Sequence, residues 1–185
     1  MARAHYVKNS RKPHQCKGGH EIPAGEGYYW AAPGFRTSKH GKKFACSAHP
    51  FRESELTSGL RSEPLAARVA LNVALDAVTD IEGIEGAWQD FVSELESYQS
   101  QRQEALDAWE NGNSQLEDLV YTADAAVDEA TSWEPEEFSE DEPERDDYDS
   151  DEEYDEAVAE WESNRDEHFN EQVEAARDLA DGLEF

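Results

Sequence analysis

The chain of 185 residues is long enough for one ordinary domain, or for a small module with a helical extension. Its net charge is −28, and no apolar run approaches the roughly 20 residues of a transmembrane helix, which excludes a membrane-spanning helix. The opening residues MARAHYVKNSRK lack the apolar centre of a signal peptide, so we expect a soluble cytoplasmic protein.

The charge is divided between two parts of the chain. Residues 1–61 contain 11 Lys or Arg and 4 Asp or Glu, whereas residues 62–185 contain 5 and 40. This asymmetry predicts a basic module suited to a polyanion and an acidic module suited to a protein partner with a basic surface. Solubility, or adaptation to a high-salt cytoplasm, would also explain the acidic part.

Residues 1–61 predict a small β-rich module. Tyr6 and Val7 follow the start of a basic arm and predict a strand or irregular structure. Residues 28–30 read as a strand, and residues 35–45 read as its return strand, with residues 39–42 at the tip of the hairpin. We therefore expect a hairpin that leads directly into the second cysteine.

Both cysteines and four of the six histidines lie within residues 14–58. Cys16-x3-His20 and Cys46-x2-His49 form two pairs of soft ligands, one at each end of the predicted hairpin. Zinc is commonly held by four such side chains, and its binding energy stabilises modules whose core is too small. The spacing predicts a structural zinc site, and without the ion we expect the module to be largely unfolded.

The fourth ligand has an alternative, because His14 stands two residues before Cys16 and competes with His20 for that role. Gly18 and Gly19 favour the tight turn that such a ligand pair needs. The two cysteines could instead form a disulfide in an oxidising compartment, but the chain lacks an export signal and carries histidines at ligand spacing, which favour metal. A site with four protein ligands leaves no position for water or substrate.

Residues 50–62 predict a turn-rich connector in which Ser54 and Thr57 cap short helical turns. Ser62 then begins a helix that we expect to continue to about residue 110. Its apolar stripe starts with small residues and ends with large ones, and Gly83 and Gly86 are candidates for a kink. The stripe comprises Ala67, Ala70, Ala74, Ala77, Ile81, Ile84, Trp88, Phe91, Leu95, Tyr98, Arg102, Ala105 and Trp109.

A second helix is predicted from the capping box Ser114–Glu117 to Trp133, folded back on the first as a helical hairpin over residues 62–133. Residues 134–149 are rich in acids and contain two prolines, which predicts a disordered or extended linker with Phe138 and Tyr148 as its hydrophobic anchors. Ser150 begins a final acidic helix in residues 150–185 that packs on the hairpin. The fold class is therefore α+β, mostly α, with a zinc-stapled β-hairpin module and a three-helix bundle.

The N-terminal module contains a run of residues with a distinctive spacing. They are Ile22, Gly25, Tyr28, Tyr29, Trp30, Phe35, Arg36, Cys46, His49, Pro50, Arg52, Ser54, Leu56 and Thr57. This run resembles small proteins encoded by bacteriophages and prophages, in which the pattern C-x2-C…G-x-x-Y-x-W…C-x2-C/H-x-P-R-x-S-x-L-T precedes a long acidic helical region. The resemblance implies a zinc-ribbon or treble-clef-like module, but it brings no agreed function. The chain departs from the pattern at the second cysteine, where it offers Gly18, Gly19 or His20.

The sequence contains no phosphate-binding loop, catalytic triad or nucleophile elbow, and its acid runs lack the environment that shifts a catalytic pKa. We therefore expect no enzyme and no small-molecule substrate. The leading hypothesis is a phage or prophage accessory protein that binds a host protein, with its regularly spaced carboxylates acting as a nucleic-acid mimic against a DNA-binding or defence protein.

Two alternatives remain. A structural or virion-associated role would use the helical stripes for assembly. In the other alternative, the basic module binds nucleic acid and the acidic region is autoinhibitory, because basic and aromatic residues together suit single strands. The candidate residues for that binding are Arg11, Lys12, Tyr29, Trp30, Lys39, Lys42 and Lys43.

Overall fold

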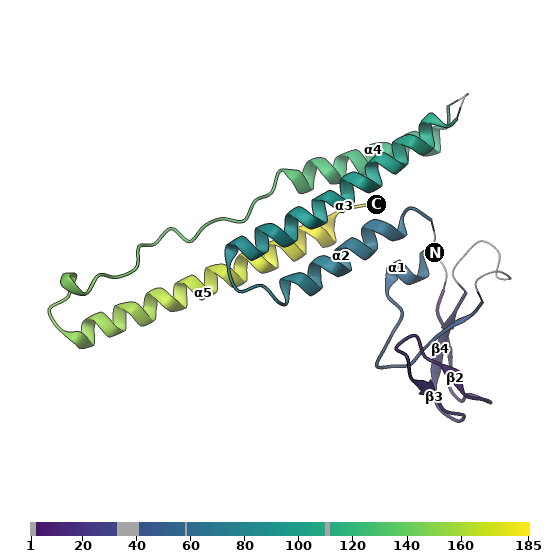
Figure 1. Ribbon diagram of the computed structural model, residues 1–185, viewed down its shortest axis with the longest axis horizontal. Helices are drawn as coiled ribbons and strands as arrows, with labels where there is room; N and C mark the ends of the chain where they lie inside the picture. Colours follow the sequence, from purple (N-terminus) through teal and green to yellow (C-terminus); the bar gives the residue numbers. More distant parts are fainter. Residues whose placement is uncertain (1–2, 33–40, 58, 110–111) are drawn as a thin grey trace. The chain divides into compact units, whose positions relative to one another are not determined.

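The computed structural model describes residues 3–32, 41–57, 59–109 and 112–185 and divides the chain into two compact units, Met1–Ala66 and Ala67–Phe185. The strands lie in the first unit, and helices make up most of the second (Figure 1). The predicted fold class, α+β and mostly α, is therefore confirmed. The boundary between the units lies slightly later than the predicted one at residue 61, within the first helical turns that follow it.

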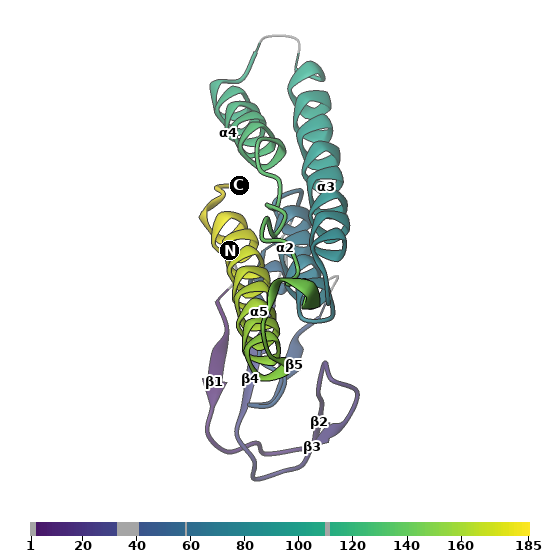
Figure 2. The ribbon, with the colours of Figure 1, turned by 90° about the vertical axis from the view of Figure 1, so that its left-hand side faces the viewer.

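The first unit contains five short strands in two sheets. They are β1 (His5–Val7), β2 (His14–Gln15), β3 (Glu21–Ile22), β4 (Tyr28–Ala31) and β5 (Lys43–Ala45). β4 lies between β1 and β5 in an antiparallel sheet, while β2 and β3 pair as a separate hairpin (Figure 2). A bridge between Cys16 and Phe44 joins the end of β2 to β5, so the hairpin is held beside the larger sheet.

The observed return strand is shorter than predicted. Ala31 pairs with Lys43, so Lys42 stands at the base of the hairpin loop and not at its tip. Within the described residues only Lys43–Ala45 is a strand of this part, and the predicted contribution of residues 35–40 lies outside the described residues. The predicted strand at residues 28–30 is confirmed.

The connector after the second ligand pair contains one short helix, α1 (Glu53–Leu56). Thr57 ends it, because both its backbone N–H and its hydroxyl donate to the carbonyl of Glu53, each at 3.0 Å. This agrees with the predicted capping role of Thr57. The carboxylate of Glu55 accepts a hydrogen bond from the backbone N–H of Arg52 at 2.7 Å, which satisfies a donor at the start of the helix.

The remaining helices are α2 (Ser62–Leu75), α3 (Ile81–Asp107), α4 (Ser114–Thr131) and α5 (Asp151–Gly182), with a short 3₁₀ turn η1 (Arg145–Asp147). The prediction of one helix from residue 62 to about 110 was wrong. α2 ends at Leu75, and α3 begins after Asp80. Asp80 is the N-cap of α3, because its side chain accepts a hydrogen bond from the N–H of Gly83 at 2.8 Å. Gly83 therefore belongs to a helix start and not to a kink.

The break also changes the register of the predicted stripe. α2 buries Leu65, Ala67, Leu71 and Leu75, whereas Ala70 and Ala77 are exposed. In α3 the predicted core is confirmed, since Ile84, Trp88, Phe91, Leu95 and Tyr98 are buried. The stripe ends there: the guanidinium of Arg102 lies 4.9 Å from the ring centre of Tyr98, and Trp109 is 57% exposed.

α4 returns antiparallel to α3, as the predicted hairpin requires. The indole N–H of Trp88 donates to the carbonyl of Ala130 at 2.9 Å, and Gln99 donates to Asp124 at 2.7 Å. The start of α4 differs from the prediction by one residue. Asn113 is the N-cap, because its side-chain oxygen accepts from the N–H groups of the second and third helical residues, and Ser114 is the first helical residue.

Residues 134–149 are largely extended, as one of the two predicted states requires, and their first half lies against α5. The N–H of Glu136 donates to Gln172 at 3.0 Å, and the indole of Trp161 donates to the carbonyl of Glu140 at 3.0 Å. The predicted anchor Phe138 makes ring contacts with Trp161 and His168 at centroid distances of 5.9 and 5.6 Å. The acid-rich segment is thus held by aromatic side chains.

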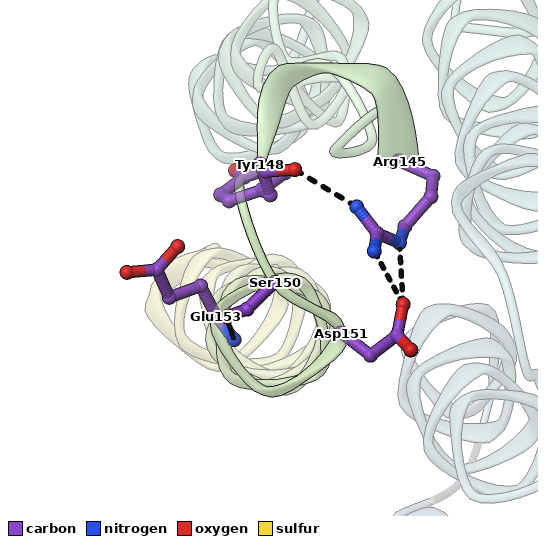
Figure 3. A network of polar contacts seen from close by, with 5 residues as sticks. All are labelled: Arg145, Tyr148, Ser150, Asp151 and Glu153. Atoms are coloured by element: carbon purple, nitrogen blue, oxygen red, sulfur yellow. Dashed lines mark hydrogen bonds and ion pairs between the residues drawn. The ribbon is translucent and has the colours of Figure 1, made fainter.

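The start of α5 confirms the predicted cap (Figure 3). The hydroxyl of Ser150 accepts from the N–H of Glu153 at 3.2 Å. The guanidinium of Arg145 binds the carboxylate of Asp151 and donates to the carbonyl of Tyr148 at 2.9 Å, which joins η1 to the helix. At the other end of α5, Arg68 of α2 donates to the carbonyl of Leu183 at 2.8 Å. Among the described residues, no helix is long and apolar enough to cross a membrane.

Candidate metal centre

The first ligand pair sits on the tight turn between β2 and β3. The N–H of Cys16 donates to the carbonyl of His20 at 2.8 Å, and the N–H of Gly19 donates to the carbonyl of Cys16 at 3.0 Å. Gly19 has a φ of +85°, a conformation that residues with a Cβ rarely adopt. The turn has three residues between Cys16 and His20, one more than a C-x2-C pair has. It still brings the two side chains to the same side.

The second pair follows β5 directly. Cys46 comes one residue after the end of the strand, and the N–H of His49 donates to the carbonyl of Cys46 at 3.2 Å, which forms a single turn. Within this turn the sulfur of Cys46 lies 3.4 Å from Nδ1 of His49. The bridge between Cys16 and Phe44, together with the N–H of Lys17 donating to the carbonyl of Phe44 at 2.8 Å, holds the two turns side by side.

The four predicted ligands come together. One ligand atom from each of Cys16, His20, Cys46 and His49 lies within 4.8 Å of the other three, so these residues can hold a metal ion. Cys16 is buried, Cys46 is half-buried, and both histidines are exposed. The site is thus anchored in the protein on the side of Cys16 and open to solvent on the side of the imidazoles.

His14, the predicted alternative to His20, lies elsewhere. Its ring stacks on Phe44 with centroids 4.1 Å apart and touches Tyr28 at 4.6 Å. It is the partner of Ile22 in the β2–β3 pairing, on the strand that leads into the turn. His14 is therefore a packing residue of the sheet, and the group of four contains His20.

The thiol of Cys46 has a lowered pKa. Desolvation raises its pKa, but hydrogen bonds from the backbone N–H groups of Ala48 and His49 more than offset this, so the pKa lies below the ordinary value of 9.0. The thiolate is the form that binds metal. Backbone donors aimed at a cysteine sulfur also stabilise its charge when a metal is bound.

Three residues beside the site were not foreseen as part of it. Gly18 lies under the imidazole of His49, where a side chain would have no room. The ammonium of Lys17 forms an ion pair with Glu55, which ties the first turn to α1. The only sequence signal for these contacts was the glycine pair after Cys16, because the partners are more than 30 residues apart in the chain.

The residues predicted to bind nucleic acid do not all lie together. Arg11, Lys12, Trp30 and Lys42 line one groove of about 590 Å³, together with five further residues: Val7, Asn9, His14, Tyr28 and Phe44. Tyr29 and Lys43 do not line this groove. Lys39 lies outside the described residues.

No protein-family model, curated protein or solved structure matches this chain.

Proposed function

We propose that Cys16, His20, Cys46 and His49 bind one structural zinc ion, and that the protein is a non-enzymatic accessory protein that acts by binding another protein. The observation that carries the metal assignment is the convergence of the four ligand atoms within 4.8 Å. The phage or prophage origin that the N-terminal motif implies is part of the proposal. The helices of the second unit, in this proposal, pack as a bundle that displays an acidic surface.

Zinc is the metal that suits this donor set best. Two thiolates and two imidazoles are soft and borderline ligands, which favour zinc over magnesium or calcium, and a Cys₂His₂ set is a common tetrahedral structural site. Four protein ligands fill the coordination sphere, so the ion has no position for a reacting water. Its role in the proposal is to stabilise a unit in which the strands of the described residues contain at most four residues each.

The zinc proposal is tested by native mass spectrometry of the full chain purified with zinc and then dialysed. We expect one zinc ion per chain, and loss of that ion in the variant Cys46→Ser. His5→Ala is a matched control, because His5 lies on β1 and stacks on Trp30 away from the four ligands. Retention of zinc by Cys46→Ser, or a metal-free native chain, would show that the assignment is wrong.

The partner surface is proposed to be the acidic helical unit. The carboxylates of α5 extend along most of its length and are exposed. They include Asp151, Glu152, Glu153, Asp155, Glu156, Glu160, Glu162, Asp166 and Glu167. A dense array of carboxylates attracts a basic protein surface and can occupy a site built for the phosphates of DNA. The proposed partner is therefore a host DNA-binding or defence protein.

The partner proposal is tested by affinity capture from the natural host, followed by competition between the captured protein and duplex DNA. We expect the full chain to displace DNA from its partner, with a displacement that weakens as salt rises in the way that DNA binding does. Capture of a protein whose binding leaves its DNA site free would contradict mimicry. The test of zinc stoichiometry described above is independent of this result.

A further inference from the structure

Six of the nine residues that line the groove described above are of two kinds. Arg11, Lys12 and Lys42 supply three exposed cations, and the ring systems of Tyr28, Trp30 and Phe44 supply half-buried aromatic walls. The ammonium of Lys42 lies 4.2 Å from the ring centre of Trp30. The groove therefore combines positive charge with aromatic surface within one compact unit.

The loop that carries two of the cations is held in place by Ser10, which is buried. The N–H of Ser10 donates to the carbonyl of Glu26 at 2.8 Å, and its own carbonyl accepts from the N–H of Gly25 at 2.8 Å. The hydroxyl of Ser10 donates to the carbonyl of Lys12. Arg11 and Lys12 are thus fixed at the edge of the groove by backbone contacts, and their side chains stay free in solvent.

The pairing of the strands decides which aromatic residues face the groove. Trp30 pairs with His5 on one side and with Phe44 on the other, whereas Tyr29 pairs with Tyr6 and with Ala45. Neighbouring residues of a strand point to opposite faces of the sheet. Tyr29 and Lys43 therefore lie on the face away from Trp30, although they are the sequence neighbours of groove residues.

We propose that this groove binds a short stretch of single-stranded nucleic acid. Arg11, Lys12 and Lys42 bind successive phosphates, and a base stacks on Trp30 after the flexible side chain of Lys42 swings from the ring to a phosphate. Binding nucleic acid through the first unit goes beyond the proposed partner of the acidic helices and does not depend on it.

The aromatic walls favour nucleic acid over an acidic peptide as the occupant. An acidic peptide would use the three cations, but its carboxylates would gain nothing from the faces of Trp30 and Tyr28. A single strand presents both phosphates and flat bases, and each stacked base adds binding energy that is independent of sequence. The volume of the groove, about 590 Å³, is large enough for planar groups that lie against its walls.

The test measures fluorescence anisotropy of a labelled oligothymidylate of about 10 nucleotides with the zinc-loaded full chain, against a polyglutamate peptide of equal charge. We expect saturable binding of the oligonucleotide that is tighter than binding of the peptide. Trp30→Ala should weaken it about tenfold, within the range for one stacked base. Lys42→Gln should reduce the slope of log affinity against log salt by about 0.7, the loss of one phosphate contact.

The matched controls are Tyr29→Ala and Lys43→Gln, which remove the same kinds of side chain from the opposite face, and both should bind as the native chain does. Lys42 and Lys12 are exposed, so their variants keep the test valid if Trp30→Ala fails to fold. Absence of binding by the full chain, equal binding of the polyglutamate peptide, or equal losses in the groove and control variants would each overturn the proposal.

Discussion

The ring of His49 lies directly against the backbone of Gly18 at the candidate metal centre. A Cβ placed on Gly18 would lie 2.7 Å from both Cγ and Nδ1 of the His49 ring and 2.9 Å from Cδ2, closer than carbon atoms approach without a shift. The imidazole of His49, in the turn of the second ligand pair, therefore packs against the backbone of Gly18 in the turn of the first pair. The two turns fit together because one of them lacks a side chain at this point.

Gly18→Ala is expected to weaken zinc binding without removing a ligand. The added methyl displaces the ring of His49, and a misplaced ligand commonly costs about 10- to 100-fold in metal affinity. Competition with a chromophoric chelator measures this change. The control is Gly86→Ala on α3, where a Cβ meets nothing within 4 Å and should leave zinc affinity unaltered. Equal affinities in Gly18→Ala and the native chain would contradict the close packing.

His20→Ala and His14→Ala should separate a ligand from a packing residue. Removal of the His20 imidazole leaves three protein ligands, and we expect a much weaker site in which water completes the coordination. Removal of the His14 ring takes away its stacking on Phe44 and lowers the free energy of unfolding by about 1 kcal/mol, with the four ligands intact. The spectrum of the cobalt-substituted protein distinguishes four protein ligands from three.

If the His14→Ala variant alters the cobalt spectrum and His20→Ala does not, the assignment of the two histidines must be exchanged.

The ion pair of Glu55 with Lys17 should make the stability of the first unit depend on pH. Desolvation raises the pKa of Glu55, but the hydrogen bond from Lys17 and the N–H of Arg52 outweigh it and hold the pKa below 4.5. A lowered pKa in the folded state stabilises the protein above the unfolded value, and this contribution is lost as pH falls through the folded pKa. Because the pair is partly solvated, we expect about 0.5–1 kcal/mol near pH 7.

Urea unfolding of the native chain and of Glu55→Gln measures this contribution. The difference between them should be present at neutral pH and should vanish well below pH 4.5, where both carry an uncharged group at residue 55. Glu53→Gln on the same short helix is the control, because Glu53 is exposed and has no ion pair among the described residues. A difference that persists unchanged in acid would show that the charge of Glu55 is not its cause.

Trp88→Phe should destabilise the helical unit by about 1–2 kcal/mol, because it removes the indole donor to the buried carbonyl of Ala130. That carbonyl then keeps only backbone contacts at the end of α4, such as the long hydrogen bond of 3.4 Å from the N–H of Trp133. Helical circular dichroism during urea unfolding reports the change. Trp109→Phe makes the same substitution at a side chain that is 57% exposed, and it should alter stability by less than about 0.5 kcal/mol. Equal effects at the two sites would argue against the hydrogen bond.

Phe138→Ala should release the extended segment from α5. The ring of Phe138 contacts Trp161 and His168, and its loss should accelerate hydrogen exchange at the N–H of Glu136, which donates to Gln172. Tyr121→Ala removes a ring that is 77% exposed and should leave exchange in residues 134–142 unchanged. Rapid exchange at Glu136 in the native chain would show that the segment is not held in solution.

The sequence was sufficient to predict features that depend on local spacing. The approach of the two Cys/His pairs to one another, the strand at residues 28–30 and the buried stripe from Ile84 to Tyr98 were confirmed, because turns, strands and helix faces follow from a few neighbouring residues. The start of α5 was equally local, since one hydroxyl and one backbone N–H define it.

Features that depend on competition or on distant contacts were missed. The predicted stripe continued from Ala77 to Ile81 without an interruption in its spacing. Periodicity alone therefore could not reveal that the helix ends and that Asp80 caps a new one. Acid-rich composition predicted a disordered or extended linker, and only the position of Trp161 and His168 on α5 shows where Phe138 lies. The glycine pair after Cys16 indicates a tight turn, but neither turn considered alone shows that Gly18 contacts His49.

The division of the chain into two units also determines how it can be labelled chemically. All six lysines lie within Met1–Ala66, while the helical unit Ala67–Phe185 has none. An amine-reactive dye or crosslinker will therefore attach no side chain in the helices and can report on the first unit alone. Acylation of the same lysines would remove six of the positive charges of the first unit and leave its arginines and the carboxylates of the second unit unchanged. A single reagent can therefore separate the contribution of the lysines to any binding event from that of the acidic helices.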